Sequence, residues 1–464
     1  MECSNSNEPI CLNQIHLLEA RDELKNNIRR YVIVGAGAAG ISAAETIREH
    51  DPGADVLPIC EEPDGYYSRP GLAYYLTGEL NETQLFPMKE LDYRRLNLKP
   101  LIARATQILP AEHLIKLHDG SLVSYDRLLI ATGATAARST ATGQELEGVI
   151  KLDNLNDARR ILKLARRSRC AVVVGGGITA LELVEGLRAR GVKVHYLLRK
   201  DRYWGNVLDE TESKIVEHRL IEEGVQIHYH TDLAEILGGR GRVVGIRTQD
   251  GKILDCNLVA IAIGIVPRLE LAKTAGLDID RGILVNEYLQ TSQPEIYAAG
   301  DVAQVFDPLT GKSVLDSLWG PARDQGRIAG LNMAGKTAVY LKPIAFNVTR
   351  LAGLTTTIIG AVGSGRDEDL VGIARGDSEI WRELPDAIAA QDNFNVNRIR
   401  ILVGKESLLG AVVMGDQTLS RPLQQMILRR ADISPIRSNL LSPSARLGDV
   451  IAGFWTAWKF SHAA

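Results

Sequence analysis

The stretch Tyr31–Gly40, YVIVGAGAAG, decides how the rest of the chain is organised. Its apolar run, three spaced glycines and a helix-like continuation to His50 predict a buried strand, a tight turn and a helix. Gly35 permits the turn, Gly37 leaves room for a pyrophosphate, and Gly40 allows the helix to pack close to the strand. The helix N-terminus offers free N–H groups and a positive dipole end to phosphates. The stretch therefore predicts a dinucleotide site.

The next strand of this unit, Asp55–Cys60, is followed by two acidic residues, Glu61 and Glu62. They lie about 20 residues after the glycine turn, where such units place an acid that binds a ribose diol. Either residue fits this role, and a solvated pair of loop charges would give the same pattern.

A second strand, turn and helix follow about 140 residues later in Cys170–Ala180, CAVVVGGGITA. Ala180 takes the place of the third glycine, which is tolerated because the position needs only a small side chain. Two such units indicate two dinucleotides, a donor and a resident carrier. The contacts predicted for the second dinucleotide include Gly175, Gly177, Ile178 and Thr179.

The second strand of this later unit, Val192–Leu198, ends without an acid. Arg199 and Lys200 follow Leu198 directly, and Arg202 is close by. An acid at this point would repel a 2′-phosphate, so its absence beside cations favours NADPH over NADH. NADH remains open, because the same charges also suit a solvated edge.

Composition excludes several classes of function. The 464 residues, 45% hydrophobic and 24% charged, are too many for one core and predict two or three domains. A net charge of −3 gives no reason to expect nucleic acid or an anionic membrane surface. Five scattered cysteines without metal or redox spacing fit a reducing cytosol. No apolar run suggests a secretory signal or a transmembrane helix, so a cytoplasmic location is predicted.

Three later strands end at a glycine, in Leu128–Gly133, Leu258–Gly264 and Glu295–Asp301. Asp301 directly follows the glycine of the last strand. A carboxylate at such a strand end is well placed to accept a hydrogen bond from a hydroxyl group of a sugar-like chain.

From Lys336 onward the pattern becomes β-rich and predicts a third domain of antiparallel character. Its expected strands are 346–351, 355–359, 398–403 and 408–414. One apolar face over 447–458 predicts a last helix that packs on the body or on a second subunit, and a homodimer is left open. The pattern of residues 1–29 predicts an N-terminal strap across the body that contains a short amphipathic helix. Residues 226–228 and 243–248 are expected to be strands of one small meander. The histidines lack a carboxylate or cysteine pattern, so no metal site is predicted.

Together these segments resemble the two-dinucleotide flavoprotein reductases, which include putidaredoxin-type ferredoxin reductases, NADH–rubredoxin reductases and the flavoprotein part of nitrite reductase. The resemblance runs from about Tyr31 to Gly335 and continues more weakly to Gly415-Asp416-Gln417. It implies FAD on the first glycine turn, a nicotinamide cofactor on the second, hydride transfer between them, and a small iron–sulfur or rubredoxin-like acceptor protein. The alternatives are an NAD(P)H oxidase, a nitrite-reductase-like reductase of small acceptors, or a flavin-based redox-sensing interaction protein.

The resemblance also implies roles for single residues. Asp301 would bind the ribityl chain of FAD, and Arg69 and Pro70 would lie beside its isoalloxazine, with Trp319 near the ring. Glu182 would approach both the nicotinamide and the flavin, so Glu182 and Arg69 are the expected catalytic residues. The remaining predicted cofactor contacts are Ala38, Ala39, Ala131, Thr132, Gly133, Gly264 and Gly300.

Two departures from the family pattern matter. A Ser-Lys pair, whose lysine pairs with the glutamate matching Glu182, is replaced here by Ala73-Tyr74. The cysteines of the disulfide reductases are also missing, because Ser68, Arg69 and Gly71 fill that loop. The sequence therefore predicts an FAD-dependent NAD(P)H oxidoreductase without a redox-active cysteine pair.

The predicted architecture is α/β, with two Rossmann-like dinucleotide-binding domains of the glutathione-reductase type and a C-terminal α+β domain. The expected boundaries are an N-terminal extension at 1–29, an FAD-binding domain at 30–150 and 282–335, an NAD(P)-binding domain at 151–281, a C-terminal domain at 336–430 and a tail helix at 431–464.

Overall fold

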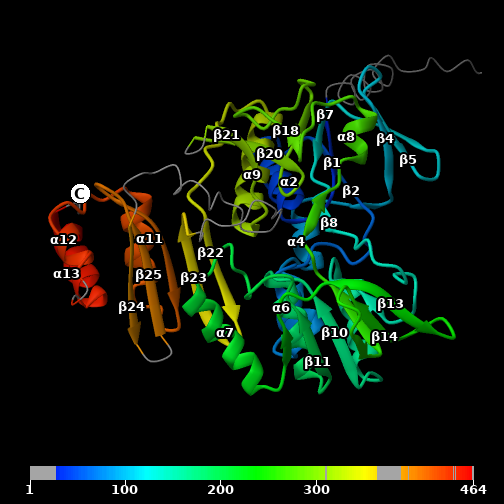
Figure 1. The fold of residues 1–464 in the computed structure, drawn as a ribbon. Coiled ribbons are helices and arrows are strands. Elements are labelled where there is room, and N and C mark those ends of the chain that lie inside the picture. Colours follow the sequence, from blue (N-terminus) through cyan, green and yellow to red (C-terminus); the bar gives the residue numbers. More distant parts are fainter. Residues whose placement is uncertain are drawn as a thin grey trace, which may run out of the picture.

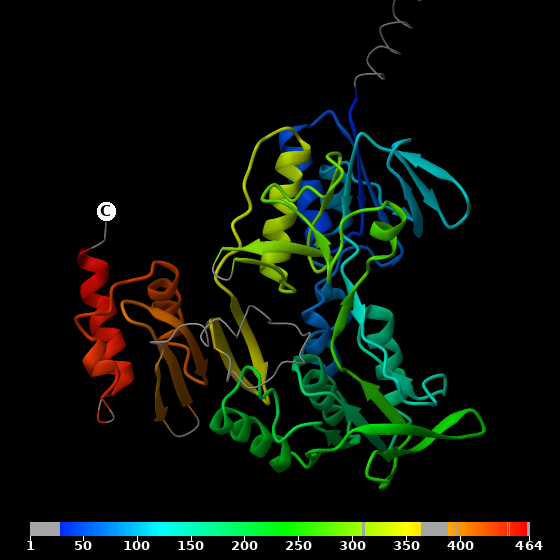
Figure 2. The same ribbon diagram turned by 45° about the horizontal axis from the view of Figure 1, so that its top comes forward.

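A computed structural model shows three units, with the first above the second and the C-terminal unit to the left of both (Figures 1 and 2). The residues described are 28–308, 311–362, 388–394 (backbone only), 397–442, 444 and 446–461. Residues 1–27, which hold most of the helix expected within 1–29 as well as Cys3 and Cys11, lie outside these ranges.

The first unit contains a five-stranded sheet in the order β19-β7-β1-β2-β3, with all neighbouring strands parallel. Its strands are β1 (Arg30–Val34), β2 (Asp55–Cys60), β3 (Leu101–Ile102), β7 (Arg127–Ile130) and β19 (Ile296–Ala298). At the turn after β1, Gly35 has a φ of +109°, and a Cβ there would lie 2.1 Å from the Ala131 carbonyl oxygen. Glycine is therefore required at this turn. The predicted strand, turn and helix are confirmed.

Helices and small sheets complete the first unit. Its helices are α2 (Ala38–His50), α3 (Gly71–Thr77), α4 (Glu90–Arg95), α8 (Glu270–Thr274), α9 (Trp319–Met333) and a 3-10 turn at Glu82–Leu85. One small sheet joins β4 (Ala105–Leu109), β5 (Leu114–Leu117) and β6 (Leu122–Ser124), and another joins β18 (Ile283–Leu284), β20 (Ala303–Asp307) and β21 (Lys312–Leu315). Helix α2 packs closely on α9, because a Cβ at Gly326 would lie 2.1 Å from the Ala39 carbonyl oxygen.

The second unit repeats the arrangement in a sheet ordered β12-β11-β10-β16-β9. Its strands are β9 (Val149–Ile150), β10 (Cys170–Val174), β11 (Lys193–Leu197), β12 (Gln226–His228) and β16 (Leu258–Ile261), with helices α5 (Leu155–Ala165), α6 (Ile178–Ala189) and α7 (Glu210–Glu222). Strand β9 places the start of this sheet two residues before the expected boundary at 151. The two units are joined by an antiparallel pair, β8 (Ala134–Ala136) with β17 (Ile265–Pro267).

One expectation about this unit is wrong. Gln226–His228 does not belong to a meander, because β12 pairs in parallel with β11 and extends the main sheet. The meander consists of β13 (Leu233–Gly239), β14 (Arg242–Thr248) and β15 (Ile253–Asp255). A strand of three residues is too short for its side-chain pattern to indicate its partner.

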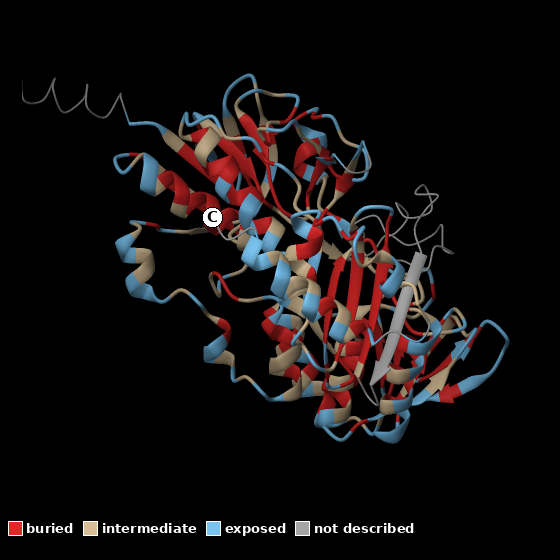
Figure 3. Cartoon of the chain, turned by 90° about the vertical axis from the view of Figure 1, so that its left-hand side faces the viewer, coloured by how far each residue is buried: buried red, intermediate tan, exposed pale blue. Residues whose placement is uncertain are grey.

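The C-terminal unit is an antiparallel sheet in the order β22-β23-β26-β25-β24. Its elements are β22 (Phe346–Leu351), β23 (Leu354–Gly360), β24 (Ile388–Phe394), β25 (Asn397–Val403), β26 (Leu408–Met414), α11 (Ser420–Leu428), α12 (Arg437–Leu440) and α13 (Leu447–Ser461). Buried residues run along its strands, and exposed residues lie on the outer faces of helices (Figure 3). The predicted last helix packs against this sheet's core through Leu447 and Ile451. The α/β fold class is confirmed.

Candidate functional site

A cavity of about 710 Å³ lies at the carboxyl ends of β1, β2, β7 and β19. This is the edge of a parallel sheet at which such folds bind ligands. The cavity brings together most of the residues predicted for the first dinucleotide. They are Gly35, Gly37, Ala38, Ala39, Glu61, Glu62, Arg69, Pro70, Ala131, Thr132, Gly133, Gly300, Asp301 and Trp319.

Two predicted residues do not line this cavity. Gly40 lies beneath the glycine turn, and a Cβ there would be 1.9 Å from the Gly35 carbonyl oxygen, so its small size serves close packing. Gly264 lies at the start of the antiparallel connection between the units, where its carbonyl accepts a hydrogen bond from the Ala137 N–H at 2.9 Å. Its neighbour Ile265 lines the cavity instead.

The glycine turn leaves open space for a bound group. A Cβ built on Gly37 would meet no atom within 4 Å, although this residue caps helix α2 and lines the cavity. The backbone N–H groups of the first helical turn have no partners within the helix. A pyrophosphate fits such a position, because it accepts these hydrogen bonds and suits the positive end of the helix dipole.

Asp301 offers a half-buried acceptor shortly after the carboxyl end of β19, at the same edge of the sheet as the first glycine turn. Burial raises the pKa of its carboxyl group to about 6, and the charge of Arg69 acts against that rise. Among the described residues, no side chain donates a hydrogen bond to this carboxylate. A carboxylate that lines the cavity and has no side-chain donor suits a ligand that carries hydroxyl groups. Asp301 and the open glycine turn together fit FAD.

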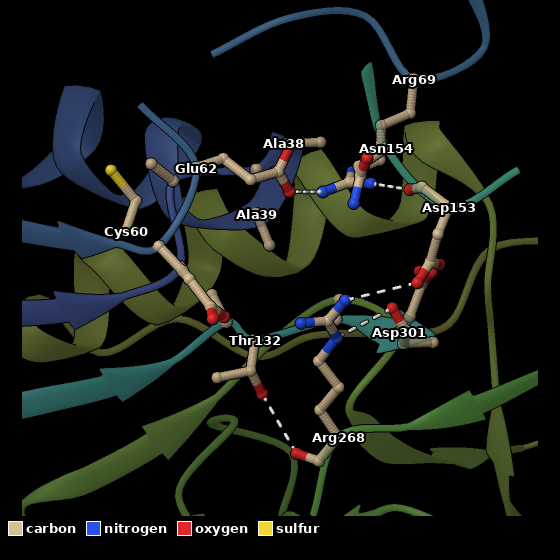
Figure 4. A pocket seen from close by; sticks show the side chains of 18 of the residues that line it. Ala38, Ala39, Cys60, Glu62, Arg69, Thr132, Asp153, Asn154, Arg268 and Asp301 are labelled. Atoms are coloured by element: carbon tan, nitrogen blue, oxygen red, sulfur yellow. Dashed lines mark hydrogen bonds and ion pairs between the residues drawn. The ribbon is translucent and has the colours of Figure 1, made fainter. Parts of the chain in front are cut away.

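The Arg69 side chain reaches across the cavity from the loop after β2 to the loop after β9 (Figure 4). It donates to Glu62 Oε1 at 2.6 Å and to the backbone carbonyl of Asp153, and its guanidinium lies 5.4 Å from the centre of the Tyr67 ring. Tyr67 Oη also donates to Glu62, at 2.5 Å. The Glu62 carboxylate is therefore engaged within the loop, whereas Glu61 is exposed at the cavity edge.

Several residues that line the cavity were not predicted from the sequence, among them Asp153, Asn154 and Arg268. Arg268 Nη2 lies 3.6 Å from Asp153 Oδ2. The backbone carbonyl of Arg268 accepts a hydrogen bond from Thr132 Oγ1 at 3.2 Å (Figure 4). Arg268 directly follows β17, and Asp153 accepts hydrogen bonds from Thr135 Oγ1 and the Ala136 N–H of β8, so the pairing of β8 with β17 brings them together. They had no recognisable motif in the sequence.

A second cavity of about 220 Å³ adjoins the first and shares Pro70, Ser317, Leu318 and Trp319 with it. Helix α6 of the second unit contributes Ile178, Thr179, Glu182 and Glu185. Burial raises the pKa of the half-buried Glu182 to about 7, with a further contribution from Glu185. The helix that follows the second glycine turn therefore lines a cavity that shares a wall with the first one.

The loop after β11 lies on the second glycine turn, since Trp204 N–H donates to the Gly176 carbonyl at 3.1 Å. A Cβ on Gly177 would meet no atom within 4 Å, as at Gly37 in the first unit. Arg199 is exposed after the buried Leu198. Arg202 is held by Asp201 at 2.8 Å, which leaves Arg199 and Lys200 as the other cations at this strand end.

Two other features bear on the chemistry. His195 Nδ1 and His228 Nε2 are 3.0 Å apart, and no cluster of potential metal ligands occurs within the described ranges. Cys60, Cys170 and Cys256 are unpaired thiols. None of the helices in the described part of the chain combines the length and hydropathy that crossing a bilayer requires.

Comparison with known proteins agrees with this geometry. Residues 29–329 match the pyridine nucleotide-disulphide oxidoreductase family. An NADH oxidase of Methanocaldococcus jannaschii is 33% identical over 344 residues, covering 72% of this chain and 76% of the archaeal protein. A rubredoxin-NAD(+) reductase of Pseudomonas putida is 30% identical over 357 residues, covering 76% and 91%. One chain in the crystal structure of the covalent putidaredoxin reductase–putidaredoxin complex superposes with a TM-score of 0.79 at 24% identity, covering 92% of this chain and 98% of that chain. The chain belongs to the pyridine nucleotide-disulphide oxidoreductase family.

Proposed function

We propose that this chain is an FAD-dependent NAD(P)H oxidoreductase that passes electrons to a small iron–sulfur or rubredoxin-like protein. The observation that carries this proposal is the shared wall between the two cavities at Pro70 and Trp319. The larger cavity is lined by the first glycine turn. The smaller cavity is lined by helix α6, which follows the second glycine turn. Ligands held by both turns would therefore meet at this wall.

The described residues would bind and orient both cofactors. Bound FAD would supply the redox chemistry, which is two-electron uptake from a nicotinamide and stepwise release to an acceptor. The turn at Gly37 would hold its pyrophosphate, Asp301 its ribityl hydroxyls and Glu61 its ribose diol, because Glu62 is engaged by Tyr67 and Arg69.

Near the reacting rings, Arg69 and Pro70 would line the larger cavity, and Glu182 would line the smaller one. No pair of residues that transfers a proton is needed for hydride transfer, so positioning is the main task of the protein. The relatives named as rubredoxin-NAD(+) reductases support a small electron-carrier protein as the acceptor. A cytoplasmic location fits the unpaired thiols.

We propose NADPH as the preferred donor, on the ground of the cations at the end of β11. Arg199→Ala is expected to raise the KM for NADPH about tenfold and to leave the KM for NADH nearly unchanged. A hydrogen bond to a charged group contributes about 1.5–3 kcal/mol, and tenfold corresponds to about 1.4 kcal/mol. Steady-state kinetics with both donors checks this, and equal changes in the two KM values would refute a phosphate contact.

The second candidate is an NAD(P)H oxidase, favoured by the 33% identical relative named NADH oxidase. Turnover of the flavin-loaded protein with rubredoxin, with a [2Fe–2S] ferredoxin and with oxygen separates the two functions. Reduction of an electron-carrier protein at least about tenfold faster than oxygen uptake supports the proposed function. Oxygen uptake that neither carrier protein outpaces supports the oxidase.

A further inference from the structure

One wall of the smaller cavity comes from the C-terminal unit. Asn347–Arg350 of strand β22 line it together with Glu182 and Glu185 of helix α6. The cavity is therefore completed by a unit that lies outside both dinucleotide-binding sheets.

The hairpin turn after β22 is fixed to the second unit by two hydrogen bonds. Arg219 Nε donates to the Ala352 carbonyl at 2.6 Å, and the Gly353 N–H donates to Glu185 Oε1 at 3.3 Å. Leu351 and Ala352 are also buried in a core shared with the second unit. Strand β22 thus has a defined position beside helix α6.

Arg350 is held in place from two sides. Its Nη1 donates to Glu79 Oε2 at 2.5 Å, and its Nη2 donates to the other oxygen of the same carboxylate. Its guanidinium lies 5.1 Å from the centre of the Tyr74 ring, within the range of a cation–π interaction. Its Nε is buried and has no hydrogen-bond partner among the described residues. The Nε donor of the guanidinium therefore remains unused.

The charges near this cavity are mostly negative. Burial raises the pKa of Glu185 to about 7, and the positive charge of Arg350 opposes that rise. Glu182 has its pKa raised to about 7 by burial and by the charge of Glu185. Arg350 thus acts directly on Glu185, and through Glu185 on Glu182. The other ionisable groups that interact with the Glu182–Glu185 pair include Glu79, Glu223, Tyr196 and Tyr203.

We propose that Arg350 is a positioning residue, which places a positive charge beside the Glu182–Glu185 pair and thereby controls how strongly the cavity holds the cationic ring of an oxidised nicotinamide. This inference rests on the proposed function, because it assumes that the smaller cavity receives the nicotinamide. Glu79 contributes as well, since its carboxylate neutralises the charge of Arg350 and fixes the orientation of the guanidinium.

The test is the pH dependence of NAD⁺ and NADP⁺ binding to the flavin-loaded protein, measured by titration calorimetry. Above a pH of about 7 the pair is ionised and attracts the positive ring, so the Kd should fall as pH rises through this value. Binding of NADH, whose ring is neutral, should depend much less on pH.

The dependence of the Kd for NAD⁺ and NADP⁺ on pH has a midpoint, at which half of its change is complete. Arg350→Gln and Glu79→Gln should move this pH midpoint in opposite directions. Loss of the cation disfavours the ionised pair and should raise the pH midpoint of NAD⁺ and NADP⁺ binding by about one unit, the low end of the effect of an opposite charge. Glu79→Gln leaves Arg350 without its neutralising partner and should lower the midpoint. Arg242→Gln is the matched control, because Arg242 forms an exposed pair with Glu147 at 3.0 Å away from both cavities.

Opposite shifts with an unmoved control support the inference. Unmoved midpoints, or shifts in the same direction for both variants, overturn the role of Arg350 while leaving the proposed function intact. Failure of the wild-type protein to bind NADH, NAD⁺ or NADP⁺ overturns the proposed function and the inference with it. Circular dichroism identifies a variant that fails to fold, and the sign of the shift in the other variant then decides.

Discussion

Gly37→Val is expected to give a folded protein that purifies without flavin colour. The backbone at Gly37 has a φ of −82° and a ψ of −166°, an extended conformation that valine adopts readily. Nothing lies within 4 Å of its Cβ position, so the fold tolerates the side chain. The same open space is where the pyrophosphate would lie, and valine would fill it.

The expected loss of FAD affinity is about 100-fold, since one or two hydrogen bonds to a charged group contribute about 1.5–3 kcal/mol each. Flavin released by heat denaturation and fluorescence titration of the flavin-free protein measure it. Gly53→Val is the matched control, because Gly53 is exposed and its Cβ position is also open. A Gly37→Val protein with full flavin content would contradict the assignment of FAD to the first glycine turn.

Gly177→Val is expected to have the complementary effect: a yellow protein that NAD(P)H no longer reduces. Gly177 is also extended, with a φ of −110° and a ψ of −173°, and its Cβ position is open. It lies outside the larger cavity, so flavin binding should stay intact. Obstruction of the second glycine turn should weaken nicotinamide cofactor binding about 100-fold, by the same loss of phosphate contacts.

Stopped-flow reduction of the flavin at increasing NADPH and NADH concentrations checks this, with dithionite reduction to show that the flavin itself remains reducible. The result is informative only beside Gly37→Val, because the two variants should lose different cofactors. Loss of flavin from Gly177→Val, or normal reduction by NAD(P)H, would mean that the second glycine turn does not hold the donor.

The parts of the fold that depend on local pattern could be predicted from the sequence. The unit at Tyr31–Gly40 and the one at Cys170–Ala180 each contain a strand, a glycine turn and a helix, as expected. Strand ends such as Ala131–Gly133 and Gly300-Asp301 were predicted to reach one site, and they do because parallel strands end at the same edge of a sheet.

The parts that depend on distant contacts could not be predicted. Gly353 contacts Glu185 across 168 residues of chain, and that contact places β22 beside helix α6. The substitution of Tyr74 for the expected lysine looked like the loss of a cation. The structure places Arg350 on that tyrosine ring, so a positive charge reaches the cavity from a different unit. No spacing or periodicity in the sequence indicates this.

The central claim is that two dinucleotides meet at the wall formed by Pro70 and Trp319, so that a nicotinamide reduces a bound flavin. The most direct test is the visible spectrum of the purified protein during anaerobic addition of NADPH and, in parallel, NADH. The account predicts a yellow protein whose flavin absorbance is lost on addition of about one equivalent of the preferred donor. A correctly folded, colourless protein that takes up no added FAD would contradict it.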